Sequence, residues 1–305
     1  MWLTLLGMML ISVLSAHNAP TDAWKSFFRV NQVLNVSWPH KVPAVFMPDI
    51  PLMRVAIARM NTVPEESATL QRFFSIFGSV CRGSGGRAMF VDSGANEGFW
   101  SLLAAAHGCT VLAIEPQPYC ARLIRAAGER SGVMSNVQLR TMAYAENTSG
   151  QKPCVPVGIC KGTASYAQGK VTDIRDSAYS VQVGEECFPV PLVTLDELVP
   201  SEFIELWHLD VEGAELAALR SARKLLAERR IRRIMMEVDS MQRWRMNIHN
   251  KLRIDESLAE VKAIFEGWNC TSVCDNQPFR LPSHFQWGGA KICSNMYCVA
   301  PDNRD

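Results

Sequence analysis

Short apolar runs alternate with longer helix-like runs between residues 88 and 236. The short runs predict strands at residues 88–91, 110–114, 137–140, 204–209 and 231–236. The longer runs predict helices at residues 97–107, 118–127 and 214–228. Strands and helices that alternate at this spacing form a parallel sheet with helices on both faces. The pattern therefore predicts an α/β fold with a doubly wound, mostly parallel sheet.

The segments on either side of this region follow a different pattern. Residues 17–85 are interrupted by prolines and predict an N-terminal arm or lid, with one helix that starts near Pro64 and ends at Gly78. That helix carries an apolar stripe, which we expect to serve packing, at Leu70, Phe73, Phe74 and Phe77. Residues 86–300 form the predicted main domain, with a cysteine-containing insertion at 150–190. A helix at 255–265 is followed by two cysteine-flanked segments, 270–274 and 293–299, which predict an antiparallel hairpin at the sheet edge.

The N-terminus holds an uncharged, almost wholly apolar run of 14 residues from Leu3 to Ala16. It is shorter than the ~20 residues that cross a bilayer, so we predict a signal peptide at residues 1–16 and no permanent membrane span. A short signal anchor and a buried helix are the alternatives. The expected location is the lumen of the secretory pathway or the outside of the cell.

The chain contains ten cysteines, more than an enzyme of the cytosol usually has. Seven of them cluster in two groups, at Cys154, Cys160, Cys187 and at Cys270, Cys274, Cys293, Cys298. In an oxidising lumen these predict disulfides, and a structural zinc site in the second group is the rival interpretation. Cys109 and Cys120 lie in apolar segments and are predicted to be buried free thiols. Three sequons, at Asn35, Asn147 and Asn269, make the chain a candidate glycoprotein.

Composition excludes several classes of protein and partner. The chain is 48% hydrophobic and 20% charged, which excludes disorder, collagen-like repeats and coiled coil. A formal net charge of +1 provides no general attraction to phosphate backbones or anionic membranes, so we expect no nucleic-acid partner.

The first predicted strand leads directly into a glycine-containing turn, in the segment MFVDSGANEGFW. A doubly wound sheet binds its ligand at such a strand-to-helix turn. Gly94 and Gly98 allow the backbone to turn tightly, and Asp92 provides a carboxylate that can meet a cationic amino group. Glu115 ends the second strand, where an acid can accept hydrogen bonds from the hydroxyls of a ribose. These features predict an adenosine-type ligand.

The same turn separates two classes of adenosine ligand. An oxidoreductase that binds NAD would have a GxGxxG turn, with a pyrophosphate at the helix N-terminus. Here Asn96 occupies the position of the middle glycine, and Glu97 adds negative charge at the expected place of the pyrophosphate. The turn therefore favours a ligand with a sulfonium and an ammonium group.

At these motifs the sequence resembles the FkbM-type family of S-adenosylmethionine-dependent methyltransferases, which have the Rossmann-like class I methyltransferase fold. The resemblance covers about residues 86 to 240 and depends on FVDSGANEGFWSL, AIEPQP, NVQLRTMAYAENTSG, VTLDELVP, LWHLDVEGAELAALRSARKLL and IRRIMMEVD. The string DVEGAE is the most diagnostic. Where family members usually have a lysine two residues before its aspartate, this chain has His208.

The resemblance implies roles for individual residues around S-adenosylmethionine. The implied cofactor contacts are Asp92, Gly94, Asn96 and Gly98 for the methionyl part, Glu115 for the ribose, and the backbone near Met142 and Ala143 for the adenine. Methyl transfer also needs a group that takes the proton of the acceptor hydroxyl. At the carboxyl edge of the sheet the candidates are Asp210 first, His208 second and Glu237 third. We expect His208 to lie buried under a helix, hydrogen-bonded.

Other acids accompany these candidates at the same edge. Glu212 and Glu215 are as suited to a charge pair at a helix N-terminus as to catalysis, and Asp239 follows Glu237. A divalent metal could bind at such an edge, but no pair is spaced decisively enough to assign metal ligands.

The resemblance implies an O-methyltransferase that acts on a hydroxyl of a sugar, a glycan or a secondary metabolite. Two alternatives belong to other classes. One is a secreted binding protein that keeps the fold without turnover, and the other is an NAD-dependent oxidoreductase.

Overall fold

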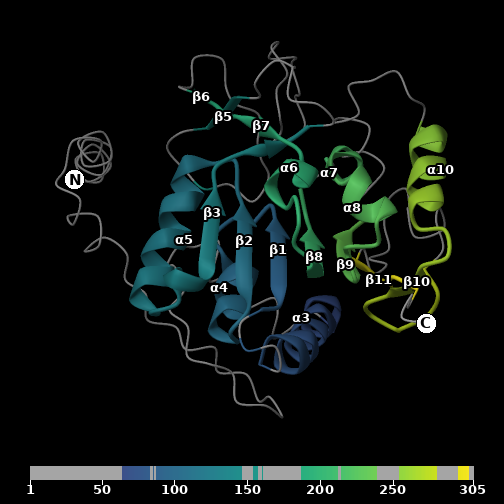
Figure 1. Cartoon of the computed structure of the whole chain (residues 1–305), viewed down its shortest axis with the longest axis horizontal. Helices are drawn as coiled ribbons and strands as arrows, with labels where there is room; N and C mark the ends of the chain where they lie inside the picture. Colours follow the sequence, from purple (N-terminus) through teal and green to yellow (C-terminus); the bar gives the residue numbers. More distant parts are fainter. Residues whose placement is uncertain are drawn as a thin grey trace, which may run out of the picture.

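The computed structural model describes residues 64–82, 85, 87–145, 154–156, 160, 187–211, 214–238, 254–279 and 295–301. Its centre is a seven-stranded sheet with the order β10-β11-β9-β8-β1-β2-β3 (Figure 1). The strands are β1 Met89–Ser93, β2 Thr110–Ile114, β3 Val137–Arg140, β8 Ile204–Leu209, β9 Arg233–Glu237, β10 Asn269–Ser272 and β11 Asn295–Val299.

Five of these strands, β3, β2, β1, β8 and β9, run parallel to one another. The hairpin β10–β11 joins them in the antiparallel direction, with β11 next to β9. The predicted mostly parallel sheet and the C-terminal hairpin are therefore confirmed.

Both faces of the sheet are buried, because successive side chains on a strand point to opposite faces. Phe90, Leu206 and Met235 pack into one core cluster. Their neighbours Val91, Trp207 and Met236 pack into the other. This double burial explains why the strands appear in the sequence as continuous apolar runs.

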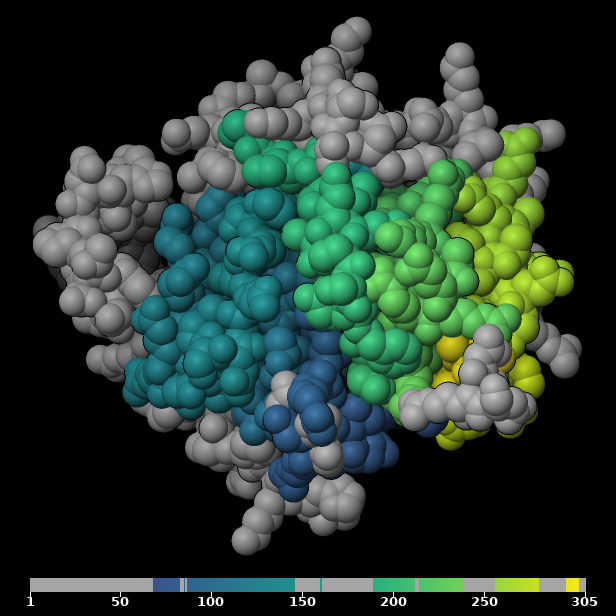
Figure 2. All heavy atoms as spheres, in the orientation of Figure 1, coloured from purple at the N-terminus to yellow at the C-terminus, as the bar shows by residue number. Residues whose placement is uncertain are grey.

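Helices cover the two faces separately (Figure 1). The first cluster includes residues of α3 Pro64–Ile76, α4 Phe99–Ala106 and α5 Pro118–Arg130. The second includes residues of α6 Leu195–Leu198, α7 Glu215–Ser221, α8 Arg223–Ala227 and α10 Ile254–Ile264. Figure 2 shows α10 beside the green α7–α8 region, where Arg220 Nε donates to Glu260 Oε1 at 2.8 Å.

Several helices differ from their predicted bounds, and in two of them the backbone shows a local reason. The helix predicted at 97–107 starts at Phe99, because Gly98 is its N-cap and has a left-handed φ of 87°. The helix predicted at 214–228 is divided into α7 and α8 at Ala222, whose φ and ψ of −113° and 22° are not helical.

The helix that starts at Pro64 does not end at Gly78, as the sequence suggests. It continues as a π-helix, η2 Phe77–Cys81. The expected packing role of its apolar stripe is confirmed, because Leu70, Phe73, Phe74 and Phe77 are all buried. Phe73 stacks on Trp100 of α4, with 4.0 Å between ring centroids.

Short strands lie beyond the carboxyl ends of β1, β2 and β3 (Figure 1). β4 Ala143–Tyr144 pairs in parallel with β7 Leu192–Val193. β5 Cys154–Pro156 pairs in the antiparallel direction with β6 Cys187–Pro189. β5 and β6 belong to the cysteine-containing segment predicted as an insertion.

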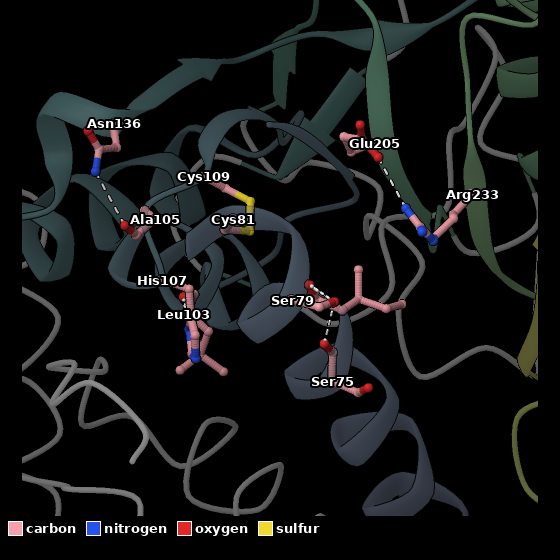
Figure 3. The surroundings of a disulfide bond; sticks show 11 residues. Ser75, Ser79, Cys81, Leu103, Ala105, His107, Cys109, Asn136, Glu205 and Arg233 are labelled. Atoms are coloured by element: carbon pink, nitrogen blue, oxygen red, sulfur yellow. Dashed lines mark hydrogen bonds and ion pairs between the residues drawn. A yellow bond between two sulfur atoms is a disulfide. The ribbon is translucent and has the colours of Figure 1, made fainter. Parts of the chain in front are cut away.

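Three disulfides join described cysteines: Cys81–Cys109, Cys120–Cys160 and Cys270–Cys298. The prediction of free thiols at Cys109 and Cys120 was wrong. Cys81 ends η2 beside the start of β2 and reaches Cys109 there (Figure 3), and Cys160 returns from far along the chain to Cys120. The rival zinc site is also wrong, because Cys270 and Cys298 face each other across the hairpin and pair.

Several expectations concern residues outside the described ranges: the signal peptide at 1–16, the rest of the arm before Pro64, and the sequons at Asn35 and Asn147. Asn269 is described and is exposed at the start of β10. Among the described helices, none is long and apolar enough to cross a membrane.

Candidate functional site

The register of the sheet brings four candidate residues into one row. Ser93 lies opposite Ile114 on one side and opposite Leu209 on the other, and Leu209 lies opposite Met236. The next residues on the four strands are Glu115, Gly94, Asp210 and Glu237. Parallel strands that end together place these residues along one carboxyl edge, which is where open α/β sheets bind ligands.

Gly94 allows the turn after β1 to approach the neighbouring strand closely. Its φ is 79°, and a Cβ at this position would lie 1.8 Å from the backbone oxygen of Asp210. Its N–H donates to the Ile114 carbonyl at 3.0 Å, and the N–H of Asp210 donates to the Ser93 carbonyl at 3.0 Å. The turn is therefore fixed between β2 and β8, with space for no residue except glycine.

Glu115 is hydrogen-bonded to the same turn. Its Oε2 accepts the backbone N–H of Asn96 at 2.8 Å, and its Oε1 accepts the backbone N–H of Gln117 at 2.8 Å. Asn96 has a left-handed φ of 51°, which directs its N–H toward this carboxylate. Glu115 is only 2% exposed, and burial raises its pKa to about 7 against the effect of these hydrogen bonds.

Asp92 is fully buried, and both of its carboxylate oxygens have protein partners. Oδ1 lies 2.8 Å from Nδ1 of His208, and Oδ2 accepts the hydroxyl of Ser101 at 2.5 Å. Each carboxylate oxygen can accept a second hydrogen bond, but these two bonds already satisfy both oxygens of Asp92 within the protein. Its observed partners make Asp92 a link between β1, β8 and α4.

His208 has the environment that we expect from the sequence. It is 4% exposed and hydrogen-bonded, beneath the aromatic rings of two helices. Phe73 of α3 meets it edge to face at 5.1 Å between ring centroids, and Trp100 of α4 at 5.9 Å. A histidine so enclosed is suited to holding Asp92 in place.

Glu97 is the third buried acid of the turn, and it differs from the other two. It is 6% exposed, and its Oε1 has no hydrogen-bond partner among the residues that the structure describes. Burial raises its pKa to about 7, although its own backbone N–H favours the ionised form. A buried polar atom without a partner is rare in proteins and calls for an explanation.

Three side chains that the sequence did not single out form hydrogen bonds next to the row. Trp207 Nε1 donates to the hydroxyl of Ser93 at 2.7 Å, and this hydroxyl lies 2.6 Å from that of Tyr144. These residues are far apart in the sequence, and no motif connects them. The register of β1 and β8 brings Ser93 near Trp207, and Tyr144 reaches Ser93 from β4, outside the central sheet.

The remaining candidate residues differ in how deeply they are buried. Asp210 and Glu237 are half-buried, and so is Met142, whereas Ala143 is buried and its N–H donates to the Pro191 carbonyl at 3.0 Å. Glu215 is fully buried and accepts the N–H of Val211 at 3.2 Å, which suits the charge-pair alternative at the start of α7. Glu212 and Asp239 lie outside the described residues.

The Cys120–Cys160 disulfide lies against the glycine turn. Cys160 Sγ is 3.1 Å from Asn96 Oδ1, and Cys120 Sγ is 3.8 Å from the same oxygen. A disulfide sulfur has no hydrogen to donate, so these are packing contacts. They hold the side chain of Asn96 against the start of α5.

No group of three or more His, Cys, Asp or Glu side chains is placed to hold a metal ion within the part of the chain that the structure describes.

Comparison with known protein families identifies the part of the chain that carries this edge. Residues 92–269, more than half of the chain, match the family described as Methyltransferase FkbM domain. The matched segment begins at Asp92 and contains the whole row. No curated protein matches the chain.

Solved structures of methyltransferases are similar at low identity. The human methyltransferase 10 domain containing protein is 13% identical, with 83% of this chain and 87% of that chain covered and a TM-score of 0.41. A putative rRNA-methylase from Clostridium thermocellum is 9% identical, with 76% and 93% covered and a TM-score of 0.41. The bifunctional kinase-methyltransferase WbdD is 13% identical, with 88% and 45% covered and a TM-score of 0.41.

Proposed function

The chain belongs to the FkbM family of S-adenosylmethionine-dependent methyltransferases, and we propose that it methylates a hydroxyl group of a sugar, a glycan or another small molecule. The observation that carries this proposal is the row at the carboxyl edge. It combines a closely packed glycine turn with an acid on each side, Glu115 and Asp210. No charge in this row favours a pyrophosphate.

The residues present fit S-adenosylmethionine. The turn at Gly94 leaves no Cβ between the backbone and a ligand, and Glu115 stands at the end of β2, where ribose hydroxyls can donate to it. Gly98 and Asn96 complete the turn, and the backbone at Met142 and Ala143 is the proposed neighbour of the adenine. Buried carboxylates on the turn suit a ligand that carries positive charge.

When bound, the cofactor supplies an electrophilic methyl group on a sulfonium. The protein's own residues then have to align the acceptor, exclude water and receive one proton from its hydroxyl. Asp210 is the proposed base, because it is half-buried in the row beside Gly94. His208 and Asp92 position β1 against β8, and Glu237 on the next strand is a further candidate for contact with the acceptor.

The compartment proposed for this reaction is the secretory pathway. Disulfides such as Cys81–Cys109 and Cys270–Cys298 persist in oxidising environments. The apolar run from Leu3 to Ala16 supports the same location as a cleaved signal peptide.

The test is a screen of glycans and metabolites with methyl-labelled S-adenosylmethionine, using full-length protein from a secretory host. We expect label in an acceptor through a bond that survives mild alkali, as an ether does. Label that mild alkali releases would indicate a methyl ester, and label on nitrogen would also contradict O-methylation of a hydroxyl. The variant Asp210→Asn serves as the inactive control.

A further inference from the structure

Three buried acids lie in or beside the glycine turn, and they are not equivalent. The oxygens of Asp92 are paired with His208 and Ser101, across β8 and α4. Those of Glu115 accept hydrogen bonds from Asn96 and Gln117. Within the described residues, Glu97 keeps one buried oxygen, Oε1, without a hydrogen-bond partner. Of these three acids, Glu97 therefore has the greatest need of a further hydrogen-bond donor, and it is not the acid that the family resemblance suggests.

The position of Glu97 is suited to one part of S-adenosylmethionine. It directly precedes Gly98, the N-cap of α4, and it lies within electrostatic reach of Glu115, the proposed ribose acid. The methionyl chain of the cofactor carries an ammonium next to a carboxylate. An ammonium has three donors and no acceptor, so it matches an unpartnered carboxylate oxygen.

We propose that Glu97, and not Asp92, binds the α-ammonium of the methionyl chain of S-adenosylmethionine. This assignment depends on the proposed function, because it places that cofactor at the same turn. The ammonium supplies the partner that Glu97 Oε1 lacks and compensates its burial. Asp92 remains bonded to His208 and Ser101 and keeps the two strands and α4 together.

The protonation behaviour of Glu97 agrees with this role. In the cofactor-free protein, burial raises its pKa to about 7, so a cation that approaches the carboxylate favours the ionised form. The pKa of Glu115 is also raised, chiefly by burial and to a smaller extent by the charge of Glu97. Two neighbouring carboxyl groups with raised pKa values at one edge of a sheet are typical of a ligand site.

The experiment compares three ligands by calorimetry on the full-length protein. S-adenosylmethionine and S-adenosylhomocysteine both carry the ammonium, but only the first has a sulfonium. Methylthioadenosine has the adenosine and the sulfur without the amino-acid chain. The variants are Glu97→Gln, Glu115→Gln and, as a matched control, Glu129→Gln at an exposed position of α5.

We expect Glu97→Gln to weaken S-adenosylmethionine and S-adenosylhomocysteine by ~10- to 100-fold, the scale of a hydrogen bond to a charged group, with methylthioadenosine unchanged. Glu115→Gln should weaken all three, because all contain the ribose, and Glu129→Gln none. Thermal melts check that each variant is folded.

Three results would overturn the assignment. Equal losses for all three ligands in Glu97→Gln would mean that the turn as a whole is disturbed. A loss for S-adenosylmethionine alone would mean that Glu97 meets the sulfonium. Unchanged affinities would return the ammonium to Asp92. If the wild-type protein binds none of the three ligands, the proposed function itself fails, and this assignment fails with it.

Discussion

Ionisation of Glu97 and Glu115 opposes folding of the cofactor-free protein. Both are almost fully buried, and both have a pKa raised to about 7. Each therefore keeps its proton in the folded chain at a pH where the unfolded chain has already lost it. This behaviour links a binding site to the pH dependence of stability.

Glu97→Gln is predicted to stabilise the cofactor-free protein above pH 7. The ordinary pKa of a glutamate is 4.5, and burial raises the pKa of Glu97 in the folded chain to about 7. The free energy of unfolding therefore falls as the pH rises from about 4.5 to about 7, and it stays lower above that range. Glutamine has no charge to lose, so the variant avoids up to about 3 kcal/mol of this decrease.

Urea denaturation at pH 5 and pH 8, with disulfides intact, measures the effect. The gain in unfolding free energy of the variant over the wild type should be larger at pH 8 than at pH 5. Comparing the two proteins at the same pH cancels the contributions of the other titrating groups. A stability difference that is no larger at pH 8 than at pH 5 would contradict the raised pKa of Glu97.

Asp210→Asn is predicted to lower the rate of methyl transfer by at least ~100-fold with little change in cofactor affinity. Asp210 stands in the row beside Gly94 and is half-buried, whereas His208 is enclosed and bonded to Asp92. Single-turnover kinetics with a labelled cofactor measures the rate. His208→Gln, which keeps a donor toward Asp92, should cost less. If His208→Gln abolishes turnover and Asp210→Asn does not, the two roles are reversed.

The sequence predicts where the candidate site residues lie better than it predicts their hydrogen-bond partners. Asp92, Gly94 and Glu115 are placed at strand ends by the local pattern alone, and the structure brings them to one edge. The bonds of Asp92 to His208 and Ser101 depend on strand register and helix placement, which no local pattern contains. For this reason the free acid of the turn could not be identified before the fold.

At the level of elements, a disulfide supports the site from outside the sheet. Cys120–Cys160 joins the first turn of α5 to a residue 40 positions away, and its sulfurs pack on Asn96. The backbone N–H of Asn96 in turn holds Glu115. Loss of this disulfide should therefore affect both stability and the cofactor turn.

The double variant Cys120→Ser with Cys160→Ser is predicted to lose about 4 kcal/mol of unfolding free energy, the loop-entropy value for a loop of this length. It should also bind S-adenosylmethionine more weakly, because Asn96 loses its packing. The control is Cys270→Ser with Cys298→Ser, which removes a disulfide of the hairpin.

The control should lose a similar amount of stability and keep its affinity for the cofactor. Chemical denaturation and calorimetry measure the two quantities. Equal affinities in the two double variants would show that the disulfide has no influence on the turn.

The elements that the sequence predicts best are those with a single dominant signal. β2, β3 and β8 have the predicted bounds. β2 and β8 are mostly apolar runs, and β3, the last strand of the sheet, alternates apolar and polar residues in the sequence VQLR. The π-helical continuation past Gly78 and the break at Ala222 carry no such signal and arise from packing. The pairing of Cys109 was missed because its apolar surroundings also fit a free thiol, and its partner Cys81 lies in a different element.

On the scale of the whole molecule, the packed faces of the sheet and its candidate site lie in different places. Two core clusters on its faces hold the strands in register, and the carboxyl edge carries the acids of the row. α3, which lies in the segment predicted as an arm, packs into the first cluster and reaches His208 through Phe73. The segment before the glycine turn therefore contributes to the support of the site.

The central claim is that the carboxyl edge of this sheet binds S-adenosylmethionine. Calorimetric titration of the full-length protein with S-adenosylmethionine, and separately with NAD, tests it most directly. We predict one S-adenosylmethionine per chain with a dissociation constant in the micromolar range, a loss of at least ~10-fold in Glu115→Gln, and no heat of binding with NAD. Binding of NAD, or no binding of S-adenosylmethionine by the folded wild-type protein, would contradict the claim.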